Sequence, residues 1–398
     1  LFNIILRIAS AFYFGDTEVH MEWGRLVHNL SLTGILGINV IIDNFSALTE
    51  YAKPGDTVIP SVFMPPLYAY YVYLLKILSF DFFELVNLVI FSQIILSSIS
   101  IYVFFKILQN FCTKNLSLLL TILFSTFPLY VYSSIQTSSI TLQIFLIIFY
   151  LYYILKFLDD KNLKNIIFFS IFGGLLILTR GEFFIFYLFT LLYFFVFLKF
   201  RLKPLIISLF ISILLITPYL KRNFDNFQVL VLTKSFGYNL LKGNNPELKV
   251  EGSYQFILKN FNQKDLKIKT DNHYEINLDN FYREKAIEII QDNPPLYLGL
   301  YFKKVISFLF IDLNSSYPNY YNLFHIVPKI IISIFSFFGA MLCFTRKGLF
   351  QFLSFYYVLN ILLFSVFFIL PRYSLILLPV QLLLSIQAID YLRRKLFN

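Results

Sequence analysis

The chain has 398 residues, of which 58% are hydrophobic and 20% aromatic, and its mean hydropathy is +0.70. This composition excludes an ordinary soluble domain and is typical of an integral membrane protein. The net charge of +10 does not indicate a nucleic-acid partner, because the basic residues occur in short groups between apolar segments rather than on one aromatic-rich patch.

Apolar segments of membrane-spanning length follow one another along most of the chain. The run before Gly15 is too short to cross a bilayer unaided, which suggests an incomplete N-terminus, and we count it as a partial first helix. Nine further crossings are predicted near residues 84–105, 116–133, 138–157, 163–180, 183–199, 204–220, 326–345, 348–370 and 373–392. The pattern predicts an all-α polytopic membrane protein with about ten transmembrane helices.

Basic residues between these segments set the expected orientation. They form five groups: Lys106 and Lys114; Lys156, Lys161 and Lys164; Lys199, Arg201 and Lys203; Arg346 and Lys347; and Arg393, Arg394 and Lys395. If all five are cytoplasmic, as the positive-inside rule expects, the opposite helix ends face outward. The apolar stretch 64–79 then cannot cross, and we expect it to lie along the outer membrane surface as a juxtamembrane helix.

Two polar regions fall on the outer side. The first outer loop, 15–83, is rich in acidic residues, and residues 221–312 are numerous enough for a small extracytoplasmic subdomain. This subdomain includes an amphipathic helix that we expect to begin at Asp279 and to end at Asn293. The stretch that follows, 296–310, carries two adjacent lysines near its middle and is interpreted as an interfacial helix.

Ionisable residues recur at the predicted outer helix ends. They are Asp16, Glu18, His20, Arg180, Glu182, Lys221, Arg222 and Arg372. A carboxylate can take a proton from an acceptor hydroxyl or amine, and arginine grips a phosphate with paired donors. The combination suits transfer of a group from a phosphorylated lipid whose tail lies in the bilayer.

Simpler interpretations of these residues stay open. The acids could merely be solvated, Arg180 and Glu182 could form a local ion pair, and Arg222 and Arg372 could anchor helices at the headgroups. Asp16, Glu18 and His20 could also bind a divalent metal, because carboxylates and imidazole suit several such ions. The sequence does not require a metal, and any cofactor is unknown.

Several blocks, in order, carry a resemblance to a known family. They are GDTE at 15–18, MPPLYAYYVYLLKIL at 64–78, GLLILTRGE at 174–182, the stretch from TPYLKRNF at 217 to KGNNP at 246, and PRYSLILLP at 371–379. The chain resembles the C-type (GT-C) glycosyltransferases that use polyprenyl-phosphate sugars. The resemblance is to the bacterial branch related to dolichyl-phosphate-mannose protein mannosyltransferases and lipid A aminoarabinose transferases.

The resemblance implies a GT-C fold, with a membrane module of seven helices and juxtamembrane helices in a large first outer loop, and it assigns roles to particular residues. Asp16 would be the general base of an inverting displacement at the sugar C1, and Glu18 would orient the acceptor or help to bind a metal. The residues that would face the lipid phosphate are Arg222, Arg372, Lys221 and Arg180. The residues that would position acceptor or donor are Glu182, Tyr238, Asn244 and Asn245.

Two departures from the family pattern accompany the resemblance. The family often has His or Lys immediately before the double proline, where this chain has Met64, so that phosphate contact is missing or comes from another group such as Lys53. The family also often has an acid near residues 134–141, where this chain offers only amide and hydroxyl side chains. Acceptor or metal binding is therefore expected to differ from the family pattern.

The expected protein is a multi-pass enzyme of the bacterial plasma (inner) membrane with an extracytoplasmic active site. It would move one sugar from a polyprenyl-phosphate donor to a lipid, glycan or protein acceptor. The predicted division is a catalytic module at 1–220, the outer subdomain at 221–312 and C-terminal membrane helices at 313–398. Two alternatives are a lipid-linked glycan transporter or flippase, and an oligosaccharide polymerase or ligase.

Overall fold

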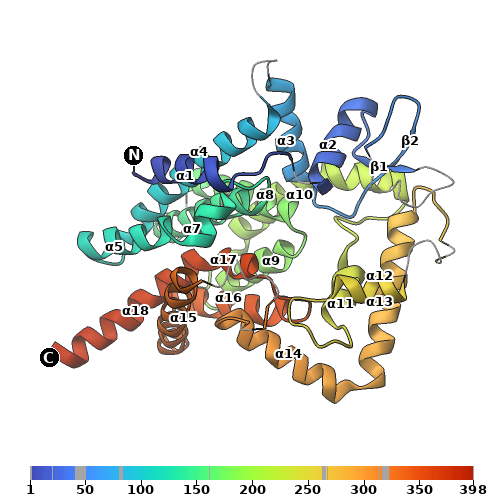
Figure 1. Cartoon of the computed structure of the whole chain (residues 1–398). Helices are drawn as coiled ribbons and strands as arrows, with labels where there is room; N and C mark the ends of the chain where they lie inside the picture. The colour runs from blue at the N-terminus through green and yellow to red at the C-terminus, as the bar shows by residue number, and fades with distance from the viewer. Residues whose placement is uncertain are drawn as a thin grey trace.

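The computed structural model describes residues 2–397 except 20, 41–50, 80–83, 161, 262–265, 267, 313 and 316–321. Its described part is mainly helical (Figure 1). The elements, in chain order, are α1 (Phe2–Phe14), α2 (Met21–Thr33), β1 (Gly37–Val40), β2 (Thr57–Pro60), α3 (Pro66–Leu78), α4 (Leu85–Leu108), α5 (Lys114–Ser125), α6 (Pro128–Ser133), α7 (Ile140–Asp159), α8 (Leu163–Thr179), α9 (Phe183–Val196), α10 (Leu202–Phe227), α11 (Phe236–Gly243), α12 (Tyr254–Asn260), α13 (Tyr274–Asp292), α14 (Pro294–Leu309), α15 (Leu323–Cys343), α16 (Leu349–Phe364), α17 (Pro371–Leu375) and α18 (Leu378–Phe397).

Each predicted crossing segment corresponds to one helix or to two consecutive helices. Pro128, which starts α6, divides the segment predicted at 116–133 into α5 and α6, because proline cannot donate the hydrogen bond that would continue α5. Within the described residues α4, α7, α10 and α15 are long and apolar enough to cross a membrane, and α1, α5, α8, α9 and α16 are shorter apolar helices. The predicted polytopic α-helical fold is confirmed.

Close packing joins the C-terminal helices of the bundle. A Cβ atom at Gly339 of α15 would lie 2.0 Å from the carbonyl oxygen of Leu384 in α18, so only glycine allows these two helices to approach so closely. Elsewhere in the bundle, Tyr187 of α9 bonds to Ser208 and Ser212 of α10 at 2.6 and 2.7 Å. These three polar side chains within the apolar bundle therefore satisfy one another across two helices.

The first outer loop contains the helix α2, as expected from the predicted juxtamembrane helices, and a small antiparallel ribbon that the sequence did not predict. In this ribbon β1 pairs with β2, and Gly37 stands opposite Pro60. Asn29 of α2 holds the loop together, because its side chain donates to the Gly37 carbonyl at 3.0 Å and accepts from the Ala52 amide at 3.0 Å. The predicted juxtamembrane stretch 64–79 corresponds to α3.

The outer subdomain differs from the prediction at one helix start. Helix α13 begins at Tyr274, so Asp279 lies within the helix and does not cap its N-terminus. Instead, the Asp279 carboxylate accepts hydrogen bonds from the amides of Gly237 and Tyr238, at 2.7 and 3.1 Å, in the first turn of α11. The prediction was wrong because an aspartate that caps a distant helix has the same local pattern as one that caps its own.

The ends of the helices divide between two sides of the molecule. In Figure 1 the N-terminus, the start of α5 and the C-terminal end of α18 lie on one side. The elements α2, β1, β2, α11, α12 and α13 lie on the other. The side opposite the basic ends of α5 and α18 therefore carries both polar regions.

Candidate active site

A cavity of about 280 Å³, here called the central cavity, lies where several connections between helices meet. Its lining comes from α2, the segment before α3, the α6–α7 loop, the α8–α9 turn, α11 and α17. The charged side chains in this lining are Glu22, Arg180, Glu182, Lys242 and Arg372. Three cations therefore face two carboxylates, which gives the cavity a positive excess suited to an anionic ligand.

Arg180 is the most firmly held of these cations. Its guanidinium carbon lies 4.8 Å from the ring centroids of both Phe364 and Tyr373, and its Nη2 atom lies 3.6 Å from Glu182 Oε1. Only 14% of its side chain is exposed. Ring contacts use the faces of a guanidinium and leave its edge donors for a planar or tetrahedral anion. Arg180 is therefore held in a fixed position in the lining of the central cavity.

Lys242 is a functional candidate that the sequence reasoning missed. Its Nζ atom lies 4.4 Å from the ring centroid of Phe368, and it lines the central cavity together with Met64. Burial lowers the pKa of Lys242, and the nearby charge of Arg372 acts in the same direction. Lys242 is thus a basic residue in the same cavity lining as Met64, which stands where the family often has His or Lys. Lys53, the substitute suggested by the sequence, is exposed and does not line this cavity.

Asp16 does not itself line the central cavity, but the α6–α7 loop binds it through Thr137, which does. Its Oδ2 atom accepts hydrogen bonds from the amide and the hydroxyl of Thr137, at 2.7 and 2.9 Å. Thr137 is fully buried and lines the central cavity, whereas Glu18 is exposed. The stretch in which the family acid is absent therefore supplies the hydrogen-bond donors that orient Asp16.

The predicted metal ligands lie partly outside the described residues. His20 is one of the residues that the structure does not describe, while Asp16 and Glu18 are described. Across the described ranges, no group of three or more His, Cys, Asp and Glu side chains is arranged to hold a metal ion. Binding of a metal by Asp16, Glu18 and His20 stays a prediction.

Two predicted phosphate ligands lie outside the central cavity. The guanidinium of Arg222 donates to the carbonyls of Ser61 and Leu36, at 2.8 and 2.6 Å, and so holds the first outer loop to the end of α10. Lys221 is exposed and pairs with Asp225 at 2.8 Å. The α10 helix continues for about two turns beyond the predicted end, and this extension carries both basic residues past the cavity.

The four predicted positioning residues divide into two pairs. Glu182 and Tyr238 line the central cavity. Asn244 instead accepts a hydrogen bond from buried Lys304 at 3.0 Å, and Asn245 binds the carbonyls of Lys242 and Lys249 at 3.1 Å each. The two asparagines therefore shape the loop that follows Lys242.

A second cavity of about 260 Å³, here called the aromatic cavity, adjoins the first. Both linings include Glu22, Phe63, Met64 and Tyr238. Five aromatic rings line the aromatic cavity, namely Phe63, Tyr238, Tyr254, Tyr274 and Tyr282. Its charged residues are Glu22, Arg25, Glu275 and Asp279, which gives an acidic excess opposite to that of the central cavity.

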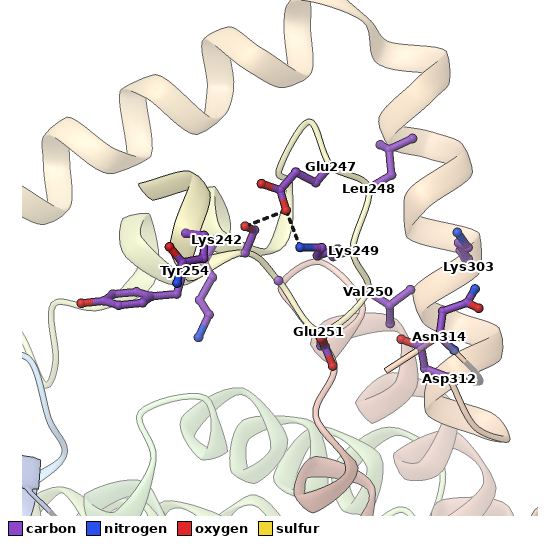
Figure 2. Close-up of a pocket in the computed structure, with 13 residues that line it drawn as sticks. Lys242, Glu247, Leu248, Lys249, Val250, Glu251, Tyr254, Lys303, Asp312 and Asn314 are labelled. Atoms are coloured by element: carbon purple, nitrogen blue, oxygen red, sulfur yellow. Dashed lines mark hydrogen bonds and ion pairs between the residues drawn. The ribbon is translucent and has the colours of Figure 1, made fainter. Parts of the chain in front are cut away.

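A third hollow of about 510 Å³ lies at the outer surface, over residues 242–255 (Figure 2). Glu247 bonds there to Lys249 at 2.7 Å and to the Ser253 hydroxyl at 3.0 Å. Figure 2 shows the ring of Tyr254 turned away from this ion pair. Because these charges neutralise each other at an exposed site, this hollow is a weaker candidate for a substrate than the two inner cavities.

Comparison with known proteins agrees with the resemblance seen in the sequence. Residues 64–221 match the family described as dolichyl-phosphate-mannose-protein mannosyltransferase. A search of curated protein sequences gives no significant match.

Solved structures with the same fold include an oligosaccharyltransferase of Archaeoglobus fulgidus. The crystal structure of its apo form matches with a TM-score of 0.55 and 14% identity, covering 99% of this chain and 50% of that one. The complex of oligosaccharyltransferase AglB from the same organism with an inhibitory peptide and a dolichol-phosphate matches with a TM-score of 0.52 and 13% identity, covering 99% and 51%. This chain thus spans about half the length of those proteins, and the predicted GT-C fold is confirmed.

Proposed function

We propose that this chain, a membrane glycosyltransferase of the GT-C type, transfers a single sugar from a polyprenyl-phosphate donor to an acceptor on the extracytoplasmic face. The family match and the fold indicate glycosyl transfer from a lipid-linked donor in general. The observation that carries the finer proposal is the central cavity, in which three cations gather next to a carboxylate held by Thr137. The proposal also includes a location in the bacterial inner membrane and an active site on its extracytoplasmic side.

The donor phosphate would bind to the cations of the central cavity. Arg180 and Arg372 would offer paired donors, while Lys242 would add a point charge next to the same phosphate. Glu182 and Tyr238 would contact the sugar. These groups would also stabilise the charge that grows on the phosphate as it leaves.

Asp16 would act as the general base. Both hydrogen bonds from Thr137 go to Oδ2, so Oδ1 would take the proton from the acceptor hydroxyl. The acceptor oxygen would form a bond to the sugar C1 from the face opposite the phosphate, and the bond from C1 to the phosphate oxygen would break. The products would be the glycosylated acceptor with inverted configuration, polyprenyl phosphate and a proton held by Asp16.

The size of the central cavity favours a single sugar over an oligosaccharide. Its volume of about 280 Å³ lies near the lower end of ligand pockets, which hold roughly 300–1,000 Å³. The fold likeness to an oligosaccharyltransferase nevertheless makes transfer of a longer glycan the second candidate. Donors that carry one sugar or several, each on a monophosphate or a diphosphate, would separate the two candidates.

The decisive experiment compares Asp16→Asn with the wild type in lipid-reconstituted enzyme. Transfer is measured from a radiolabelled polyprenyl-phosphate sugar to a cell-envelope extract that supplies lipid, glycan and protein acceptors. We expect transfer to fall by about 100- to 10,000-fold, the usual contribution of a general base. The matched control is Asp225→Asn, which removes an exposed carboxylate outside the cavity and should keep full activity. Unchanged transfer by Asp16→Asn would refute the assigned role.

A further inference from the structure

We propose that the aromatic cavity is the acceptor site, and that the group it binds is a sugar residue without negative charge. This inference rests on the proposed function, which it deepens by naming the class of acceptor. The first observation is the lining, in which five rings come from α11, α12, α13 and the segment before α3. The apolar faces of a pyranose pack on aromatic rings, while its hydroxyls bond to phenol and carboxylate oxygens.

Some of the five rings pack together along the side of the aromatic cavity, and one stands at its opening. The ring of Tyr238 meets those of Phe63 and Tyr282 edge to face, with centroids 5.6 and 5.8 Å apart. Tyr254, at the start of α12, is 52% exposed and stands at the rim. Burial raises the pKa of Tyr238, so its hydroxyl stays protonated and can donate to a sugar oxygen. A ligand in this cavity would therefore stack on rings and bond to side chains.

Four backbone amides around the aromatic cavity already donate hydrogen bonds within the protein. The amides of Val62 and Phe63 donate to Glu275 at 2.6 and 2.9 Å, and those of Gly237 and Tyr238 donate to Asp279. A bound peptide is commonly recognised by main-chain pairing, for which these amides are not free. The cavity thus favours a ligand that side chains recognise. A sugar is bound in this way, whereas an extended peptide relies on pairing with the main chain.

The charge of the lining argues against an anionic acceptor. Three carboxylates, Glu22, Glu275 and Asp279, line the aromatic cavity with one arginine. A phosphate, a uronic acid or an acidic peptide would meet like charge there, which is costly at close range. A neutral sugar or an amino sugar would not.

The shared wall brings acceptor and donor together. Glu22, Phe63, Met64 and Tyr238 line both cavities, so a sugar in the aromatic cavity would lie next to a donor in the central cavity. The two cavities carry opposite charge excess. This contrast would keep the phosphorylated donor on one side of the wall and the uncharged acceptor on the other.

The test is saturation-transfer NMR on the protein in lipid nanodiscs. The probes are methyl glucoside, methyl glucosaminide, methyl glucuronide and an acetylated, amidated serine tripeptide. We expect saturation of the glucoside and the glucosaminide and at most weak saturation of the other two. Tyr254→Ala should reduce the sugar signal at least fivefold, whereas Tyr254→Phe, which keeps the ring, should preserve it. The control is Tyr102→Ala, which removes a tyrosine that is 62% exposed on α4 and lines neither cavity.

A second readout separates this inference from the proposed function. Trp23, the only tryptophan, lines the central cavity, so its fluorescence reports polyprenyl-phosphate binding there. Tyr254→Ala should leave that titration unchanged. Equal saturation of the tripeptide or the glucuronide, or no loss of sugar signal in Tyr254→Ala, would overturn the acceptor inference. If the wild type did not bind polyprenyl phosphate, that result would count against the proposed donor site and not against the acceptor inference.

Discussion

Replacing Arg180 by glutamine should weaken donor binding far more than replacing Lys221, a cation outside the central cavity. Arg180 is only 14% exposed and is held between the rings of Phe364 and Tyr373. Its side chain therefore has little freedom left to lose when an anion binds. Lys221 lies on the same outer side but is 71% exposed and paired with Asp225. Lys221→Gln makes the same change of charge and serves as the matched control.

The expected magnitude follows from the hydrogen bonds that Arg180 would make. A hydrogen bond to a charged group contributes about 1.5–3 kcal/mol, and it is worth more where solvent screens it little. Because about 1.4 kcal/mol corresponds to a tenfold change in affinity, Arg180→Gln should raise the Kd for polyprenyl phosphate by about 10- to 100-fold. Arg180→Lys keeps the charge but loses the paired donors, so its effect should be smaller.

The assay is a titration of Trp23 fluorescence with polyprenyl phosphate in nanodiscs. Trp23 is buried, lines the central cavity and packs edge to face on Tyr68, so its signal is sensitive to occupation of that cavity. A thermal melt should show that Arg180→Gln is folded. The reasoning would fail if the folded variant bound polyprenyl phosphate as tightly as the wild type. It would also fail if Lys221→Gln weakened binding equally.

Three further predictions concern the scaffold. Burial raises the pKa of Glu275 above its ordinary 4.5, so the folded chain holds this proton more tightly than the unfolded chain does. Thermal stability should therefore fall as pH rises from about 4.5 through the raised pKa, and Glu275→Gln should flatten that slope in melts across pH 4 to 8. Gly339→Ala should lower the unfolding temperature, with about 1–3 kcal/mol lost to overpacking against the Leu384 carbonyl, whereas Gly299→Ala, which meets open space, should not. Arg222→Gln should cost about 1–3 kcal/mol in chemical unfolding, because the Ser61 carbonyl loses its guanidinium donor while the Leu36 carbonyl keeps the Ser61 amide as a donor. The Kd for polyprenyl phosphate should change less than threefold, and a larger change would place Arg222 at the phosphate.

The sequence predicts the helices well because membrane thickness sets the length of an apolar segment. It also predicts that several outer helix ends meet, since the positive-inside rule assigns each end to a side. Arg180, Glu182 and Arg372 come from three such ends and line one cavity.

What the sequence could not provide are contacts between distant segments. Arg222 and Ser61 are 161 positions apart, and Glu275 and Val62 are 213 apart. No local pattern therefore shows that these two charged side chains form hydrogen bonds with distant backbone groups. Lys242 was missed for a related reason. It lies near the end of α11, a short helix in the region that the sequence treats as a long outer loop, and only the fold places this helix at the cavity that Met64 also lines.

The segment 61–63 is held from two sides. The Ser61 carbonyl is bound by Arg222 of α10, while the Ser61 hydroxyl and the two amides that follow it are bound by Glu275 of α13. This segment leads directly into the wall between the two cavities. Because its backbone is clamped to both the bundle and the outer subdomain, the wall cannot shift to admit a larger ligand without breaking those bonds. Changes of substrate range, in evolution or by engineering, should therefore arise at the side chains of Phe63 and Met64 rather than by insertion into the loop.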